Sequence, residues 1–263
     1  KMARTAATGR TAATNRVAVQ DMKASLFLSS TSSKVTPTVS PMLQMQAAYT
    51  IATWVQVTTR VTSSSAGNIM GSSAGDKLWL NVNSGTGIIR IYHADLTPAS
   101  VVTSSTNIQD GRWHHIAASY SGGSVKIYLD GALVATQAVT GTLNFTSSIF
   151  TLGQGNTTGL VGRYSSMRVY SRALTLDEIN QLKNGNAPSG AIVSYPLNEG
   201  AGTIAYDTSG NGNHGTITTG TYTADVPTKK RELVGGNMVK NGDFEFAPPV
   251  NAVGNPTSHR WID

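Results

Sequence analysis

Residues Asp110–Ala135 read DGRWHHIAASYSGGSVKIYLDGALVA and contain the clearest strand pattern in the chain. In SVKIYL, apolar residues alternate with polar or aromatic ones, which is the period of two expected of a half-buried strand. The glycine-rich SGGS joins it to RWHHIAASY. Asp130-Gly131 is a favoured pair for a two-residue hairpin turn that leads into ALVATQAV. The stretch therefore predicts consecutive antiparallel strands, with Asp130 placed by turn geometry.

The composition of the whole chain agrees with a β-protein. Charged residues make up 13% of the 263 residues, about half of the usual share. Abundant Gly, Ser, Thr and Asn with β-branched residues are typical of sandwiches and barrels. The absence of cysteine excludes disulfides and zinc–sulfur sites. No run of 18 apolar residues occurs, so we expect no membrane span.

The other elements follow from similar patterns. Strands are expected at 49–57 (YTIATWVQV), at 77–83 (KLWLNVN) and in GIIRIYHA, FTLGQG and YSSMRVYSRAL. One helix is expected in TLDEINQLKNG, where Thr175 and Glu178 form a capping box and Gly185 ends the helix. The predicted class is all-β: a two-sheet antiparallel sandwich with one short C-terminal helix, which would pack against the sandwich edge.

Four segments describe the predicted domain organisation. Residues 1–23 are an extended basic arm, 24–222 form the sandwich, 223–238 are a linker, and 239–263 begin a second β-module or form an extended tail. Alternating polar and apolar residues return only in the last segment, which ends soon afterwards.

The N-terminal arm concentrates positive charge. It contributes the candidate anchoring residues Arg4, Arg10, Arg16 and Lys23. Basic arms bind nucleic acids or acidic surfaces. No aromatic residues interleave these charges, so a nucleic-acid partner is not expected. We expect the arm to anchor the protein to an assembly.

Several segments together carry a family likeness. YTIATWVQV, the opening stretch, LGQGNTTGLVGRYSSMRVYSRALTLDEINQLKNG and YPLNEGAGTIAYDTSGNGNHGTI resemble the laminin-G-like, concanavalin-A-like jelly rolls over residues 24–222. The resemblance implies a sandwich of two antiparallel sheets in an extracellular or surface-exposed protein. Members bind glycans, proteins or calcium.

Two parts of the resemblance leave alternatives open. A segment like SYPLNEGAGTIAYDTSGNGNHGTI precedes the sandwich core in many relatives, but here it follows the helix. It either completes this sandwich or opens a second one. The tail VKNGDFEFAPP is similar to the first strand of a galactose-binding-like carbohydrate-binding module.

Aromatic residues on strands are the candidates for ligand binding. Trp79 lies opposite the apolar face of its strand, which favours an exposed stacking side chain. Tyr92 and Tyr128 are further ligand-binding candidates on neighbouring strands. The adjacent His114 and His115 point to opposite faces, so we expect structural roles, one half-buried and one exposed.

The loop DTSGNGNHG offers hard oxygen ligands at alternate positions. These are Asp207, Ser209, Asn211 and Asn213, and calcium prefers such oxygens. The alternative is a tight Asn-Gly turn in which the Asp207 carboxylate caps backbone amides.

Catalysis is not expected from the sequence. A glycosidase needs two carboxylates about 5–9.5 Å apart, and the core lacks an E-x-D-x-E-like cluster. Asp243 and Glu245 share a strand face in the tail.

Two functions follow as hypotheses. The first is a non-catalytic structural or adhesion protein on a virion or cell surface, which contacts a surface glycan or protein and forms a homo-oligomer or larger assembly. The alternative is a carbohydrate-binding module of a larger secreted enzyme or adhesin, with calcium as its candidate cofactor.

Overall fold

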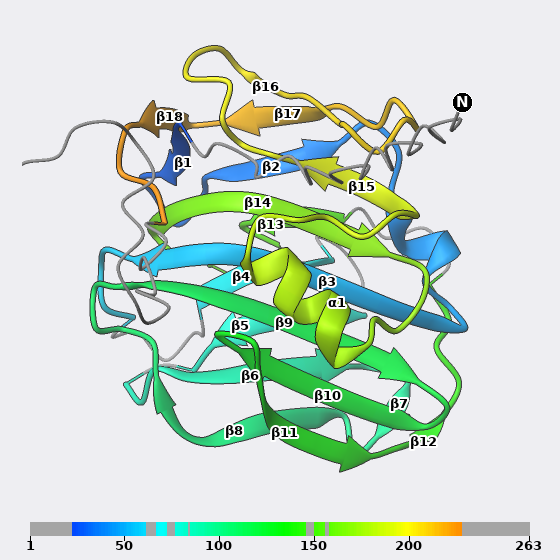
Figure 1. Ribbon diagram of the computed structural model, residues 1–263. Helices are drawn as coiled ribbons and strands as arrows, with labels where there is room; N and C mark the ends of the chain where they lie inside the picture. The colour runs from blue at the N-terminus through cyan, green and yellow to red at the C-terminus, as the bar shows by residue number, and fades with distance from the viewer. Residues whose placement is uncertain are drawn as a thin grey trace, which may run out of the picture. The chain divides into compact units, whose positions relative to one another are not determined.

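The computed structural model describes residues 23–61, 67–72, 77–83, 85–145, 150–155 and 158–227. Contacts divide the chain into two units, Lys1–Thr228 and Lys229–Asp263, and the described residues all belong to the first. In this unit two antiparallel sheets face each other as a sandwich (Figure 1). The predicted fold class is confirmed.

The strands divide between two large sheets and one small ribbon. The first sheet, here called sheet A, contains β11 (Ala132–Ala138), β10 (Ser124–Leu129), β9 (Trp113–Ser121), β3 (Ala48–Val57), β14 (Gly162–Tyr170), β1 (Ser25–Leu28) and β18 (Gly220–Thr223), in this order, with β15 (Ala191–Tyr195) also paired to β14. Sheet B contains β16 (Ile204–Ala205), β17 (Gly215–Thr218), β2 (Lys34–Pro37), β13 (Phe150–Gly153), β4 (Gly67–Ser72), β5 (Leu78–Val82), β6 (Ile88–His93) and β8 (Ser100–Asn107). The ribbon pairs β7 (Leu96–Thr97) with β12 (Thr140–Gly141).

Alternation along the strands builds the core between the sheets. The inner side chains are fully buried, as Ile51 and Val55 of β3 and Leu80 and Ile91 of sheet B illustrate. Each such side chain contributes about 1.5–3 kcal/mol by leaving water.

The segment 113–138, which includes most of DGRWHHIAASYSGGSVKIYLDGALVA, forms β9, β10 and β11, as predicted. Asp130 and Gly131 both have positive φ, 50° and 86°, as a primed hairpin turn requires. The Asp130 carboxylate also accepts a hydrogen bond from the His115 backbone N–H at 2.8 Å. Asp130 therefore forms part of the turn, and its carboxylate also holds the backbone of β9 by a hydrogen bond.

The C-terminal segment completes this sandwich rather than opening another. β15 pairs with β14, β17 pairs with β2, and β18 pairs with β1. Segments that follow the helix in sequence thus lie beside the first strands of the domain (Figure 1).

The α-helix α1 (Leu176–Lys183) has the predicted capping box between Thr175 and Glu178. The expectation that it packs against the sandwich edge is wrong. Ile179 and Leu182 are buried in a small apolar cluster on the outer face of sheet A, the face turned away from the core (Figure 1). A short 3-10 helix, η1 (Pro41–Gln44), precedes β3. Within the described ranges, no helix is long and apolar enough to cross a membrane.

Candidate functional site

An aromatic pair lies on the outer face of sheet B. Trp79 of β5 and Tyr92 of β6 are directly opposite each other in the antiparallel register. Their rings stack with centroids 4.7 Å apart and an angle of 22° between the planes. Both side chains are half-buried. The structure thus brings together two of the three predicted ligand-binding aromatics.

Gly71 of β4 explains why the indole can lie close to the sheet. Gly71 is the cross-strand neighbour of Trp79. A Cβ atom at Gly71 would clash with the Leu78 carbonyl oxygen and would lie 3.1 Å from Cδ1 of the Trp79 ring. The missing side chain leaves room for the indole between Gly71 on one side and Tyr92 on the other.

A polar pair occupies the next position on the same face. Asn81 and Arg90 are opposite each other on β5 and β6, and Arg90 Nε donates to Asn81 Oδ1 at 3.2 Å. The period of two places them on the side of Trp79 and Tyr92. Sequence reasoning missed both residues, although the alternation within LWLNV and IIRIYH contained this signal.

Two hydrogen-bond donors at this site have no partner. Trp79 Nε1 and Asn81 Nδ2 are covered from solvent and bond to nothing among the described residues. A buried unpaired polar group costs about 1–3 kcal/mol. A ligand acceptor would recover that cost, and it reaches these donors only when the side chains that cover them move aside.

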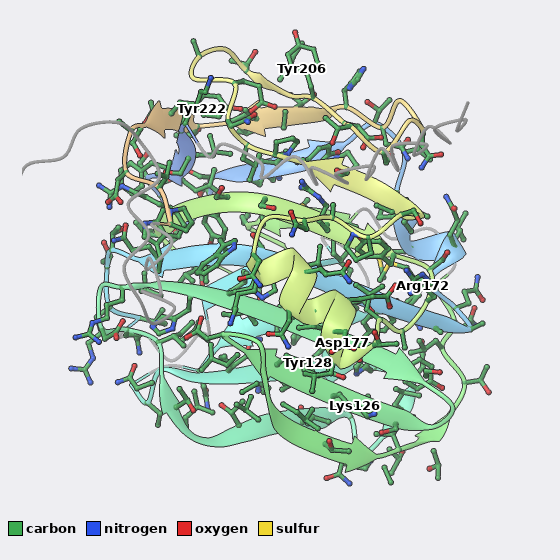
Figure 2. All side chains as sticks on the ribbon, in the orientation of Figure 1. Lys126, Tyr128, Arg172, Asp177, Tyr206 and Tyr222 are labelled. Carbon is green, nitrogen blue, oxygen red and sulfur yellow. The ribbon has the colours of Figure 1, made fainter. Side chains whose placement is uncertain are left out.

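Tyr128, the third predicted aromatic, lies elsewhere. It is on the outer face of sheet A, where α1 covers it and leaves 4% of its surface exposed (Figure 2). It packs with Ala52, Ala117 and Tyr170. The structure does not bring Tyr128 together with Trp79 and Tyr92, and in this position its ring is not available to a ligand.

The loop around Asp207 is held by its own hydrogen bonds. The Asp207 carboxylate accepts backbone N–H groups of Ser194, Ser209 and Asn213 at 2.9–3.0 Å, and the Ser209 hydroxyl at 2.7 Å. Burial opposes ionisation of Asp207, but these hydrogen bonds outweigh it and lower its pKa. This is the amide-capping arrangement.

The side-chain amides of the same loop also serve the backbone. Asn211 Nδ2 donates to the carbonyls of Ala191 and Ile192, and Asn213 Nδ2 donates to Ile192. Within the described ranges, no three His, Asp or Glu side chains are grouped so that they would hold a metal ion. Calcium binding by this loop stays a prediction.

The predicted anchoring residues fall mostly outside the described residues. Arg4, Arg10 and Arg16 are in that part, together with the linker and tail beyond 227. Lys23 is described and exposed.

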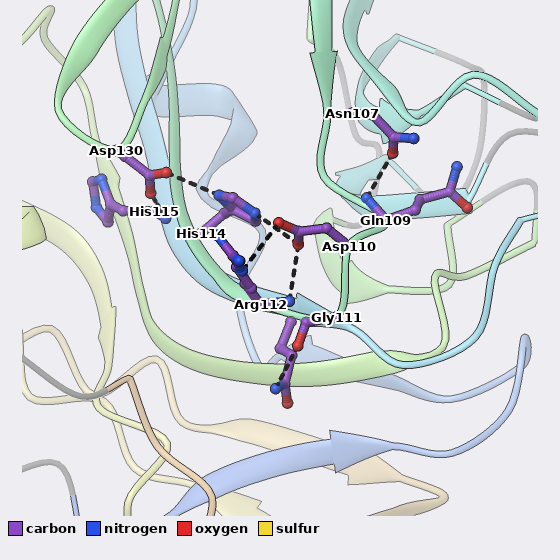
Figure 3. Close-up of polar contacts among 9 residues, drawn as sticks. Asn107, Gln109, Asp110, Gly111, Arg112, His114, His115 and Asp130 are labelled. Atoms are coloured by element: carbon purple, nitrogen blue, oxygen red, sulfur yellow. Dashed lines mark hydrogen bonds and ion pairs between the residues drawn. The ribbon is translucent and has the colours of Figure 1, made fainter.

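A charged network surrounds His114 on β9. His114 Nδ1 lies 2.9 Å from Asp130 Oδ2, and His114 Nε2 lies 3.1 Å from Asp110 Oδ1 (Figure 3). Burial lowers the pKa of His114, but the hydrogen bonds to Asp130 and Asp110 outweigh it, so the pKa is raised. The pKa values of both carboxyls are lowered. Through these two contacts His114 links the start of β9 to the β10–β11 turn.

His115 points to the opposite side, as predicted, but it is not exposed. It is 2% exposed and meets the Trp54 ring edge-on at 5.4 Å. Burial lowers its pKa to about 3. The expectation of one exposed histidine is wrong, because the outer face of sheet A is covered here too.

Fold and site together define a β-sandwich with a partly exposed aromatic pair on one outer face. A laminin-G sequence profile, described as the concanavalin A-like lectin/glucanases superfamily, matches residues 29–180, more than half of the 263 residues. The chain belongs to this superfamily. Comparison with curated protein sequences gives no match.

Solved structures with the same fold include two of particular use. A candidate carbohydrate-binding protein from Bacteroides ovatus ATCC 8483 superposes with a TM-score of 0.61 at 16% identity, over 77% of this chain and 60% of that one. A heptameric SAP-like pentraxin from Limulus polyphemus gives 0.52 at 13% identity, over 76% of this chain and 94% of that one. At these identities the likeness establishes the fold. The chain spans 60% of the length of the Bacteroides protein.

Proposed function

We propose that this domain is a non-catalytic carbohydrate-recognition module that binds saccharide on the Trp79–Tyr92 face of sheet B. The observation that carries the proposal is the stacked, half-buried aromatic pair. On sheet A, α1 covers the part of the outer face that contains Tyr128 and Tyr170, whereas the Trp79–Tyr92 pair of sheet B remains half-buried.

Stacked aromatic rings suit sugars for a physical reason. The C–H groups of a pyranose carry partial positive charge and pack against the negative face of a π-system. The stack against Tyr92 and the contact with Gly71 already fix the indole. Little side-chain entropy is then lost when a ligand binds.

The relatives support a recognition role. The superfamily is described as lectins and glucanases, and the Bacteroides protein with the same fold is described as carbohydrate-binding. We propose the same ligand class here, displayed at an extracellular, cell or virion surface. An anchoring role of residues 1–23 remains part of the proposal.

The described carboxylates support a non-catalytic role. Glu178 binds Arg172 through two bonds of 2.7 and 2.8 Å. Glu199 accepts from the Tyr206 N–H and the Tyr222 hydroxyl. Both glutamates in the described ranges are thus committed to structure, whereas a glycosidase needs a carboxylate pair directed at its substrate.

The test is a glycan array followed by titration calorimetry on the best ligand. Trp79→Ala should weaken binding by about tenfold or more, because loss of an aromatic stack costs about 1–3 kcal/mol. Tyr206→Ala, which removes an exposed aromatic 53% accessible to solvent and distinct from the Trp79–Tyr92 pair, is the control and should leave affinity unchanged.

Three details complete this experiment. Thermal unfolding of each variant shows whether the fold is intact, and Trp79→Phe keeps a ring if the alanine variant unfolds. Titrations with calcium and with a chelator, on wild type and Asp207→Asn, test the cofactor. Binding that survives Trp79→Ala in a folded protein would overturn the assignment of this face.

A further inference from the structure

We propose that the saccharide bound by this site carries an acidic group, a carboxylate or a sulfate ester, held by Arg90, Asn81 and the Trp79 indole N–H. The inference rests on the proposed function and names the ligand class of the same site. It comes from the kind of hydrogen-bonding atoms that the site leaves without partners.

The Arg90–Asn81 hydrogen bond decides what Asn81 offers to a ligand. Arg90 Nε is a donor, so the Asn81 atom 3.2 Å from it must be the carbonyl oxygen. The amide nitrogen is therefore directed elsewhere and keeps two N–H donors.

Both covered, unpaired atoms at the site are donors, whereas the Tyr92 hydroxyl can donate or accept. Asn81 is 1% exposed, and among the described residues neither its Nδ2 nor Trp79 Nε1 has a hydrogen-bond partner. An indole nitrogen only donates, and a guanidinium only donates. A ligand group that only accepts, such as a carboxylate or sulfate, matches this set better than a hydroxyl does.

The positive charge of Arg90 also favours an acidic ligand. Lys77, just before β5, is paired with Asp95 at 2.9 Å, whereas Arg90 forms no ion pair within the described part of the chain. Among the described residues, no neighbouring carboxylate balances its positive charge. Guanidinium groups bind carboxylate and sulfate-like anions through paired N–H donors.

The spacing lets one ligand reach both pairs. Trp79 and Asn81 are two residues apart on β5, as are Tyr92 and Arg90 on β6. Two residues along a strand span about 7 Å. A hexose ring packed against the exposed part of the aromatic pair would place an exocyclic acidic group near Arg90 and Asn81.

Matched ligand pairs test the inference. Calorimetry would compare oligosaccharides of glucuronic or galacturonic acid with the corresponding glucose or galactose oligomers, which differ at C6 alone. A second arm compares a sulfated galactan oligosaccharide with its desulfated, neutral form, and so separates sulfate from carboxylate. We expect at least one acidic member to bind about tenfold tighter than its neutral partner, and less so in high salt.

Two variants localise the effect. Arg90→Gln removes the charge, and Asn81→Asp places a carboxylate where it pairs with Arg90. Each should abolish the preference for the acidic ligand while neutral saccharides still bind through the aromatic pair. Arg112→Gln removes a positive charge from a side chain 83% exposed elsewhere and should change nothing. Thermal unfolding verifies that the variants fold.

The outcomes separate the two proposals. No saccharide binding, or binding indifferent to Trp79→Ala, overturns the proposed function. Trp79-dependent binding with equal affinity for acidic and neutral members, or a preference that survives Arg90→Gln, overturns the acidic-ligand inference and leaves the proposed function standing.

Discussion

Replacement of His114 by Gln should destabilise the domain in a pH-dependent way. His114 lies between Asp110 and Asp130 at the end of the sandwich (Figure 3). The raised pKa of His114 means that its stabilising contribution is complete below the unfolded pKa of about 6.5 and disappears as the pH rises through the folded pKa. The lowered aspartate pKa values mean that their contribution disappears in acid.

The network therefore contributes most between about pH 4 and pH 6.5. His114 is 13% exposed, but Asp110 and Asp130 are 38% and 46% exposed, so solvent screens both pairs. Partly exposed pairs are worth about 0.2–1 kcal/mol each. We expect His114→Gln to cost about 1 kcal/mol more at about pH 5.5 than at about pH 9.

Urea denaturation of wild type and His114→Gln at each pH measures the difference directly. The free energy of unfolding of the variant is subtracted from that of the wild type at each pH, because other histidines change the stability of both proteins in the same way. Asp130→Asn keeps the acceptor for the His115 N–H and tolerates positive φ, so a double-mutant cycle isolates the pair. A difference that is constant with pH, or larger in alkali, would refute the role of this network.

Two further predictions concern buried groups. Tyr128→Ala, beneath α1, should lower the free energy of unfolding by about 3–4 kcal/mol in urea titrations without changing saccharide affinity. Lys126→Ala on the same strand is the control, and lost binding at unchanged stability would contradict this placement. His93 is 1% exposed and bonds to the Tyr49 hydroxyl, and burial lowers its pKa to about 4. The unfolded chain therefore binds a proton more readily than the folded chain, and the wild type loses stability as the pH falls. His93→Gln should remove roughly 2–4 kcal/mol of that loss between about pH 6.5 and 4. If the free energy of unfolding falls equally with pH in both proteins, His93 does not cause the loss.

Alternation of apolar and polar residues was sufficient to predict a strand wherever one face of the strand is buried and the other is not. It located β5, β6, β9 and β10 because their inward residues are apolar at every second position. It missed β4, whose residues GNIMGS are all buried and show no alternation. A strand covered on both sides has no period of two to detect.

The position of α1 was not available from local patterns. Its capping box and apolar stripe predicted the helix itself. The docking surface is formed by Ala52, Ala117 and Tyr170, which come from three strands distant in sequence. The small residues leave space for a helix on the face, and only the strand order shows that they are neighbours.

Local sequence patterns also could not distinguish the exposure of Tyr92 from that of Tyr128. Both tyrosines occupy outward positions on central strands, so the sequence treats them alike. The structure covers Tyr128 with α1 and leaves Tyr92 half-buried beside Trp79. Which aromatic can reach a ligand is therefore decided by coverage, a property of the assembled fold.

Coverage also makes the unpaired donors of sheet B informative. Folding alone would favour a phenylalanine at Trp79 or a smaller polar residue at Asn81, since each unpaired donor costs about 1–3 kcal/mol. Local choices that oppose stability are characteristic of binding sites, where the ligand supplies the missing partner. In this domain the two donors occur beside the stacked aromatic pair and an arginine without an ion pair in the described chain. Among the described residues, unpaired nitrogens also occur on the outer face of sheet A, at Trp54 and His115, so the argument for sheet B is the combination of its unpaired donors with a stacked aromatic pair and Arg90.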